Sequence, residues 1–478
     1  MRRPLGLLAL LLLGGCVYYN GMYNTKRLAG SARKAERDGR TLEANNLWGQ
    51  VITRAESLVV RHPDSKYAEE ALVYKGIALA RLNQCSNAVR PLARGSTVVT
   101  DRVTAEEAGL ALGRCHLEMG DAAAARVAVA PVVDSKDPGR RRTARLYEAR
   151  ALRLMGQPED ALRSLDGLTG PGAAEERLLA LGMAGREAET IALADTLLVL
   201  HDSAQVWDSA VTVIGRYHPA TASALVDRVN ARPRTSQEEQ ARRLYQDALR
   251  LAAVDSAKAT ERLRKAAKLG TGTESGDRAS LALHREAISR AASPADLAMT
   301  ADSLRPLAGR ATPSSQEAKL LLFTIDGVRT AVDSSGPAFP QGDLRLFLAA
   351  ETARDSLAAP ALAANLFRQV VETWPDSPYA PKALLAGRVL DPDWGEATRP
   401  LLEEKYAASP YLGYLRGEDP DAYRALEDSL EAYVYQLETA QRRPAPGVRP
   451  GVTPQARPGV LIRPNQPKPT TPRRGLEP

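Results

Sequence analysis

The 478-residue sequence predicts an all-α protein in which helix hairpins stack into a solenoid. From about residue 41 to residue 440, segments rich in Ala, Leu, Arg and Glu carry apolar residues three and four positions apart, the spacing of amphipathic helices. Strand-like alternation is absent, and aromatic residues make up only 5% of the chain, whereas strand-rich cores rely on β-branched and aromatic side chains. We therefore expect helical repeats through most of the chain.

The N-terminus has the pattern of an export signal. Arg2 and Arg3 precede nine almost wholly apolar residues, which rise only about 14 Å as a helix and are too short to span a bilayer. The string Leu-Gly-Gly-Cys at 13–16 resembles the lipobox of bacterial lipoproteins. The resemblance implies a signal peptide at 1–15 and acylation of Cys16 as a lipid anchor; the alternative is an ordinary signal peptide with an incidental cysteine. No Asp follows Cys16, which favours the periplasmic face of the outer membrane.

Three expected helix breaks, at Asn83, Gly120 and Gly156, lie 37 and 36 residues apart. Gly or Asn suits a left-handed residue that ends a helix, and small residues let paired helices approach closely. Small residues recur at fixed distances from these breaks. Five positions after them are Ala88, Ala125 and Ala161, and seven positions before them are Gly76, Gly113 and Ala149. The period resembles the tetratricopeptide repeat (TPR), which implies TPR-like hairpins over residues 41–215. A generic helical bundle is the alternative.

One eleven-residue string occurs twice. The segments 62–72 (HPDSKYAEEAL) and 374–384 (WPDSPYAPKAL) are identical at seven positions, and each follows an expected helix. Pro ends that helix, Asp or Ser is expected to cap the next one, and Tyr is expected to pack between them. A well-formed helix corner would explain these residues. The pattern also resembles the repeats of outer-membrane lipoproteins related to BamD, the helical lipoprotein of the β-barrel assembly machine, and is similar to the repeat domain of the Tol–Pal coordinator family. The resemblance covers about residues 41–165 and 345–415.

The remaining segments complete the expected organisation. Residues 16–40 form the lipidated N-terminus and a linker, and residues 216–340 form a middle helical region that ends at a Gly- and Pro-containing break, 336–340. Residues 341–440 form a C-terminal TPR-like domain. Residues 441–478 contain ten prolines and eight basic side chains against one acidic one, so we expect a disordered cationic tail.

The charge distribution bears on the partners. Without Arg2 and Arg3 the chain has 62 basic and 57 acidic side chains, and the tail contributes +7 of this excess, so the body carries −2. A nearly neutral body argues against nucleic acid as a partner. The tail could contact peptidoglycan or another anionic polymer, or it could simply keep the chain soluble. Cys85 and Cys115 could form a disulfide or could be free cysteines in a helical core.

No residue pattern indicates catalysis, a cofactor or a metal, so we expect no catalytic, cofactor-binding or metal-binding residues. Ser31 and Lys34 match an SxxK string, but neither an SDN nor a KTG string follows. The glycine-rich segment 270–276 lacks the Gly-Lys-Ser/Thr of a phosphate loop and is expected to be a flexible turn. The five histidines form no ligand pair at helical spacing.

The sequence therefore predicts a non-catalytic, lipid-anchored scaffold that faces the periplasm and binds envelope proteins in its solenoid groove. The resemblance to BamD-like lipoproteins implies a role in outer-membrane protein assembly. An organiser of peptidoglycan or Tol–Pal machinery is the alternative, and a lipid-anchored enzyme is a third, less favoured class.

Overall fold

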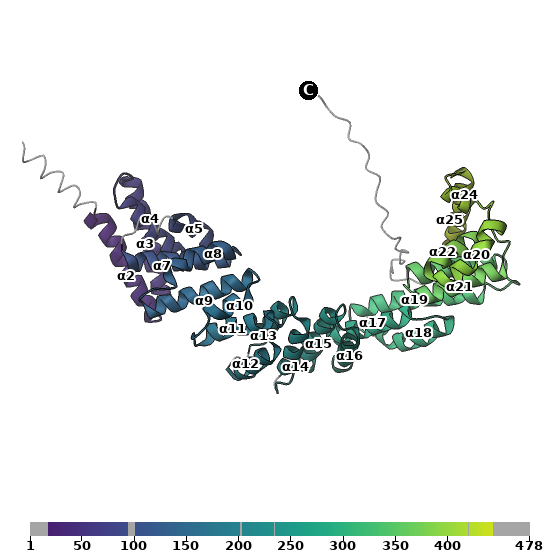
Figure 1. The fold of residues 1–478 in the computed structure, drawn as a ribbon, viewed down its shortest axis with the longest axis horizontal. Coiled ribbons are helices and arrows are strands. Elements are labelled where there is room, and N and C mark those ends of the chain that lie inside the picture. The colour runs from purple at the N-terminus through teal and green to yellow at the C-terminus, as the bar shows by residue number, and fades with distance from the viewer. Residues whose placement is uncertain (1–17, 94–100, 201–202, 234, 419, 443–478) are drawn as a thin grey trace, which may run out of the picture. The chain divides into compact units, whose positions relative to one another are not determined.

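A computed structural model describes residues 18–93, 101–200, 203–233, 235–418 and 420–442. These residues form helices joined by short turns and contain no strand, which confirms the predicted all-α fold of TPR-like hairpins (Figure 1). The chain divides into two compact units, unit 1 (Met1–Thr235) and unit 2 (Ser236–Pro478), and each is described by itself. The finer subdivision expected at residues 215 and 340 stays a prediction. None of the described helices is long and apolar enough to cross a membrane.

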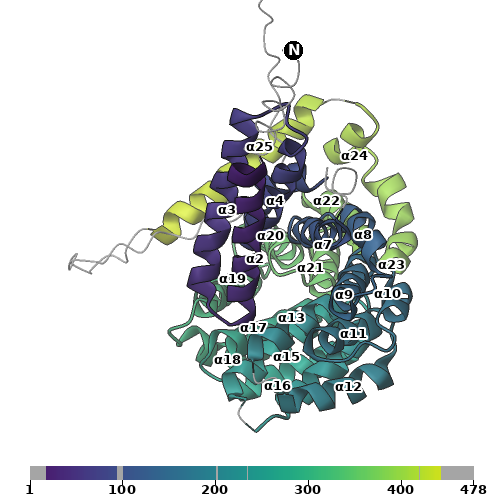
Figure 2. The same cartoon turned by 90° about the vertical axis from the view of Figure 1, so that its left-hand side faces the viewer.

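Unit 1 is a series of helix hairpins in which the two helices of each pair pack on each other. Its helices are η1 (Tyr18–Tyr23), α2 (Asn24–Arg37), α3 (Thr41–Arg61), α4 (Ala68–Arg81), α5 (Cys85–Ala93), α7 (Arg102–Glu118), α8 (Ala122–Val129), η2 (Ala130–Val132), α9 (Pro138–Leu154), α10 (Pro158–Ser164), α11 (Pro171–Met183), α12 (Glu187–Leu200), α13 (Ala204–Gly215) and α14 (Pro219–Asn230). The first helix of one hairpin also contacts the first helix of the next, so α2, α4, α7, α9 and α11 form one layer. We call this the inner layer of unit 1. Figure 2 shows α2 and α3 side by side as the arms of the first hairpin.

The hairpins of unit 1 turn by the predicted mechanism. Asn83, Gly120 and Gly156 have φ values of 58°, 81° and 76°, in the left-handed region that glycine adopts without strain. At each, the break residue and the residue after it donate their backbone N–H groups to carbonyls of the preceding helix, as in a Schellman motif. Gly39 and Gly185 end α2 and α11 in the same way, so this helix end occurs five times among the described residues of unit 1, and the repeat spacing predicts three of the five.

Small residues allow the paired helices to approach closely, as the repeat predicts. Ala88, Ala125 and Ala161 are fully buried. A methyl group added at Gly76 would lie 2.8 Å from the Leu92 side chain and 3.1 Å from the Leu92 backbone nitrogen, and one at Gly113 would contact Val129. Since interiors are close-packed, neither position has room for a larger side chain.

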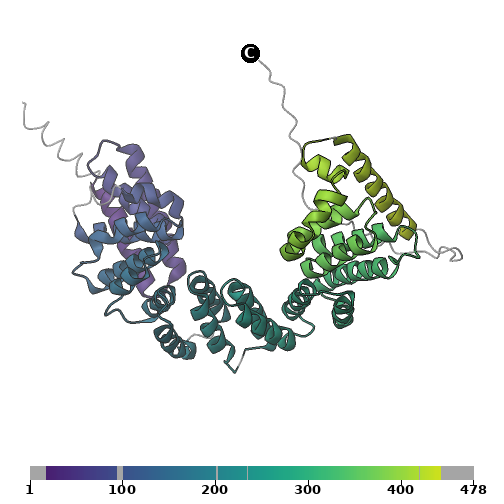
Figure 3. The same cartoon turned by 45° about the vertical axis from the view of Figure 1, so that its right-hand side comes forward.

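Unit 2 continues with helix pairs and ends on a long helix. Its helices are α15 (Gln237–Leu251), α16 (Ser256–Leu269), α17 (Glu274–Ser289), α18 (Pro294–Ala308), α19 (Ser314–Asp333), α20 (Gly342–Asp355), α21 (Pro360–Thr373), α22 (Ala380–Leu390), α23 (Pro392–Ala397), η3 (Leu401–Lys405), α24 (Pro410–Leu415) and α25 (Pro420–Arg442). Capping boxes at Ser236 and Ser293 fix the starts of α15 and α18. The largest apolar core joins α17–α22 and contains Phe347 and Phe367. In Figure 3, α25 is the long yellow-green helix at the end of this unit.

The glycine-rich segment 270–276 forms a turn at 270–273, as the sequence predicts, and its last residues begin α17. Gly276 lies in the first turn of α17, and a methyl group there would strike the backbone carbonyl of Gly270. The hydroxyl of Thr273 accepts the Gly276 N–H at 3.3 Å and donates to the Gly270 carbonyl at 2.8 Å. The glycines therefore permit a tight backbone junction between α16 and α17.

The repeated string forms the same corner in both units. The N–H of Ser65 donates to the carbonyl of His62, and that of Ser377 donates to the carbonyl of Trp374, both at 3.0 Å. The Ser hydroxyl accepts the N–H of Tyr67 at 3.3 Å, and of Tyr379 at 3.2 Å in the second copy. One detail of the prediction is wrong: neither Asp nor Ser caps the second helix, because the residue at the cap position is the tyrosine itself.

Candidate interaction surfaces

The inner layer of unit 1 carries a polar cluster around Arg33 of α2. The guanidinium donates from Nε to the two carboxylate oxygens of Glu107 on α7, at 2.9 and 3.1 Å. Its central carbon lies 5.9 Å from the ring centroids of both Trp48 and Tyr74. Burial disfavours the charge, but the contacts with Glu107 and Tyr74 outweigh it and raise the pKa of Arg33 above its ordinary value. The cation is thus held by α3, α4 and α7 together.

Neighbouring side chains close this cluster. The indole N–H of Trp48 donates to Glu36 at 2.7 Å. Arg81, at the end of α4, lies 3.5 Å from Glu36 and 3.3 Å from Glu107. Each charge has a partner of opposite sign, so the cluster joins α2, α3, α4 and α7.

A second polar cluster surrounds Glu106, the residue next to Glu107 on α7. Its carboxylate accepts hydrogen bonds from Ser135 at 2.6 Å, from Arg140 at 2.6 Å and from Arg102 at 2.8 Å. Burial opposes the charged form, but these three donors outweigh it and lower the pKa of Glu106 to about 2. Glu106 therefore joins α7 to the start of α9 as an anion at neutral pH.

Cys85 and Cys115 form a disulfide that links α5 to α7, with Cα atoms 4.9 Å apart. This separation lies within the usual range for a disulfide. Of the two possibilities left open by the sequence, the structure has the bonded pair. The link joins the second hairpin of unit 1 to the third and is buried on both sides.

The corresponding polar centre of unit 2 is Lys382 on α22. Its ammonium lies 2.8 Å from Glu427 on α25 and 3.8 Å from Glu351 on α20. It also lies 5.4 Å from the ring centroid of Phe347 and 5.5 Å from that of Tyr411. Burial, and then the proximity of Glu427, raises the pKa of the Tyr411 hydroxyl, so this hydroxyl stays neutral. One lysine thus connects α20, α22, α24 and α25.

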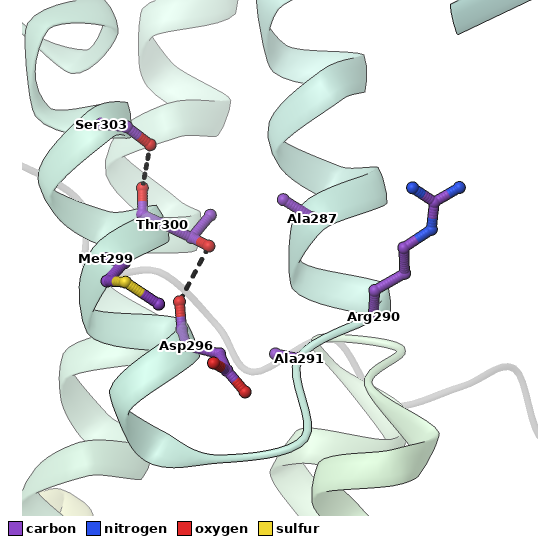
Figure 4. A pocket seen from close by; sticks show the side chains of 7 residues that line it. All are labelled: Ala287, Arg290, Ala291, Asp296, Met299, Thr300 and Ser303. Atoms are coloured by element: carbon purple, nitrogen blue, oxygen red, sulfur yellow. Dashed lines mark hydrogen bonds between the residues drawn. The ribbon is translucent and has the colours of Figure 1, made fainter.

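A surface hollow of about 460 Å³ lies between α17 and α18 (Figure 4). Its polar groups are engaged locally: Asp296 accepts the N–H groups of Ala292 and Ser293, and Thr300 donates to the Asp296 carbonyl at 2.9 Å. Arg290 extends away from Asp296 in Figure 4. The hollow brings together no nucleophile and base, so we assign no chemistry to it.

The residue singled out by the sequence, Cys16, lies outside the described residues, as do the signal peptide and residues 443–478 of the tail. Ser31 and Lys34 are exposed on α2. Within the described ranges no group of His, Cys, Asp and Glu side chains could hold a metal ion. The Arg33, Glu106 and Lys382 clusters could not be predicted from the sequence, because each depends on a contact between residues far apart in the chain: 74 positions for Arg33 and Glu107, 29 for Glu106 and Ser135, and 45 for Lys382 and Glu427.

No protein-family model and no curated protein sequence match this chain. Among solved structures, it is similar to a tetratricopeptide repeat protein from Parabacteroides merdae ATCC 43184, with 12% identity and a TM-score of 0.33, over 54% of this chain and 97% of that one. It is also similar to a chain in the structure of Naa15/Naa10 bound to HypK-THB, with 13% identity and a TM-score of 0.27. This second likeness covers 76% of the present chain and about half, 53%, of the other.

Proposed function

We propose that this chain is a non-catalytic, lipid-anchored scaffold that binds envelope proteins at the periplasmic face of the outer membrane. The observation that carries the proposal is the Cys85–Cys115 disulfide, because disulfides form and persist in oxidising compartments such as the bacterial periplasm. The expected export signal before Cys16 supports the same compartment. Stacked helix hairpins present extended surfaces suited to protein partners.

Outer-membrane protein assembly is the setting that we favour. The support is the resemblance of the repeated corner to BamD-like lipoproteins, together with the structural equivalence of its two copies. Organisation of peptidoglycan or Tol–Pal machinery is the second candidate, supported by the cationic composition of residues 441–478.

The anchor and the compartment can be tested together. Cys16→Ala should move the chain from the membrane fraction to the soluble fraction. In the wild-type chain, Cys85 and Cys115 should resist alkylation until a reductant is added under denaturing conditions. Cys85→Ser with Cys115→Ser is the matched control and should leave membrane fractionation unchanged. Unchanged fractionation of the Cys16 variant, or free thiols at 85 and 115 in cells, would contradict the proposal.

Crosslinking in cells separates the two settings. Recovery of the barrel-assembly core would support the first, and recovery of a peptidoglycan synthase or a Pal-type protein would support the second. Deletion of residues 443–478 adds a simple assay, since loss of co-sedimentation with isolated cell wall would favour the second setting.

A further inference from the structure

We propose that the outward face of α2 binds an anionic lipid surface, so that the first hairpin of unit 1 lies against the membrane. The inference rests on the proposed lipid anchor at Cys16 and names the chemistry of the surface beside that anchor. It follows from the charge of this face, from the partners of that charge, and from the place of α2 in the chain.

The outward face of α2 is a stripe of cations. Arg27, Lys34 and Arg37 are exposed and lie seven and three positions apart, which places them on one side of the helix. The alanines that α2 buries lie on the other side. Gly30 and Ser31 lie between the cations, and a methyl group added at Gly30 would reach no neighbouring element. No bulky side chain therefore keeps a flat surface away from the α2 stripe, as we call these three cations.

The charges of the α2 stripe have no partner within the described chain. None of the three cations forms an ion pair with a described residue, whereas the two other cations of α2 pair with carboxylates of α4 and α7. Asp38, which follows the helix, acts electrostatically on Lys34 and Arg37, but its carboxylate pairs with Arg40 at 2.8 Å. The stripe thus keeps positive charge that a group outside the described chain can neutralise.

The α2 stripe is close to the expected anchor along the chain. η1 begins at Tyr18, two residues after Cys16, so its start lies within about 7 Å of that residue. α2 follows η1 without a break. Tyr23, 47% exposed, lies one turn before Arg27, and tyrosine rings favour the boundary between lipid and water. A lipid on Cys16 would therefore hold the stripe near the bilayer at a high effective concentration.

Lipid phosphates fit the α2 stripe better than a single small anion does. Guanidinium and ammonium groups bind phosphate oxygens through charge-assisted hydrogen bonds. From Arg27 to Arg37 the stripe covers ten positions, or about 15 Å of helix, so its cations meet several headgroups and not one phosphate. Each basic side chain near an anionic membrane strengthens binding about fivefold, and the three together strengthen it on the order of a hundredfold.

The test attaches residues 16–478, which include every described residue, to vesicles that carry a maleimide lipid. Cys85 and Cys115 are bonded to each other, so Cys16 is the thiol that couples. The vesicles contain phosphatidylcholine alone or equal parts of phosphatidylcholine and phosphatidylglycerol, and mass spectrometry follows the acetylation of each lysine. Lys34 should react at least about fivefold more slowly on the anionic vesicles, because a bound ammonium group is shielded and stays protonated. Lys319, an exposed lysine of unit 2, is the internal control and should react equally on both.

Two double variants assign the protection of Lys34 to the α2 stripe. On anionic vesicles, Arg27→Gln with Arg37→Gln should return the reaction rate of Lys34 to within about twofold of its rate on phosphatidylcholine. Arg264→Gln with Lys268→Gln removes two exposed cations of α16 and is the matched control, which should leave Lys34 protected. All four side chains are exposed, so neither variant disturbs a core.

Equal reaction of Lys34 on both kinds of vesicle would overturn the proposal. Protection by inorganic phosphate without vesicles would assign the stripe to a small anion, and protection in intact cells but on neither vesicle would assign it to an acidic protein; both would also overturn it. Protection that disappears when residues 443–478 are deleted would assign lipid binding to the tail, with the same consequence. Because Cys16 is coupled chemically, failure of this assay is separable from failure of the anchored-scaffold proposal.

Discussion

The hairpins α3–α4 of unit 1 and α21–α22 of unit 2 share one corner but have different surroundings. In unit 1 the residues at the corner, His62, Pro63 and Asp64, are exposed. In unit 2 the hydroxyl of Tyr406 donates to the Pro375 carbonyl at 2.8 Å, and Lys405 pairs with Asp376 at 2.9 Å. The backbone corner is thus independent of what covers it.

The helices that follow the corner, α4 and α22, also differ in their charged contacts. Glu70 of α4 pairs with Lys26 of α2 at 2.8 Å, whereas the equivalent position in unit 2 holds Lys382, which faces Glu351 of α20. The pair joins corresponding helices with its charges reversed. Backbone turns and small residues therefore determine the hairpin, while the sign of the charge and the size of the core side chains differ between the two units.

The largest expected change in stability comes from exchanging the side chains at one core position between the two hairpins. Phe367 and Ala55 occupy equivalent places before the corner, and both are fully buried. Phe367→Ala should destabilise unit 2 by about 4 kcal/mol, because it leaves a cavity beside Phe347. Ala55→Phe should destabilise unit 1 by about 2 kcal/mol through overpacking. Hydrogen exchange of the full chain, measured separately on peptides from each unit, reports both losses of stability. A loss of exchange protection in both units for either variant would contradict the comparison.

The disulfide provides the next largest difference, since it is present in unit 1 alone among the described residues. Reduction, or Cys115→Ser, should destabilise unit 1 by about 3 kcal/mol. Exchange protection in unit 2 should not change, which makes unit 2 the internal control. Equal protection of unit 1 with and without reductant would show that the link adds no stability.

Acid should affect the two units in opposite directions. The pKa of Glu106 is lowered to about 2, so its contribution to unit 1 is complete above about pH 4.5 and is lost as the pH falls toward 2. Glu106→Gln should cost about 2 kcal/mol at pH 7 and remove this acid dependence. Burial raises the pKa of Glu351, so the stability of unit 2 should fall as the pH rises through that pKa. Glu351→Gln should remove this pH dependence of unit 2. Urea unfolding midpoints measured between pH 3 and pH 7 show whether the stability of each unit rises or falls with pH.

The smallest expected change in stability comes from the side chains that contact the corner of unit 2, Lys405 and Tyr406. Tyr406→Phe removes the hydrogen bond to Pro375 and should destabilise unit 2 by about 1 kcal/mol. Lys405→Met removes an exposed ion pair and should change stability by less than about 0.5 kcal/mol. If the two variants have the same urea midpoint, the hydroxyl contributes nothing beyond the ring.

Local features of the fold could be predicted from the sequence because their causes are local. A left-handed residue such as Gly120 and a small residue such as Ala125 leave a signal within one hairpin, and the two corners repeat within one string of residues. The polar clusters could not be predicted in this way. Arg33 meets Glu107 across 74 positions, and Lys382 meets Glu427 across 45. Those pairings depend on how hairpins stack, which periodicity does not encode. Gly39 and Gly185 were missed because their spacing departs from the repeat.

The buried disulfide also has a mechanical consequence. If the chain is held at its N-terminus and pulled by a partner bound farther along, the load passes through the Cys85–Cys115 bond and not through the segment between them. The bond removes 30 residues from the extensible length. That corresponds to roughly 100 Å of chain that cannot be drawn out while the bond is intact. The maximum extension of unit 1 under load would therefore be shorter than its residue count suggests, and reduction of the disulfide would increase it.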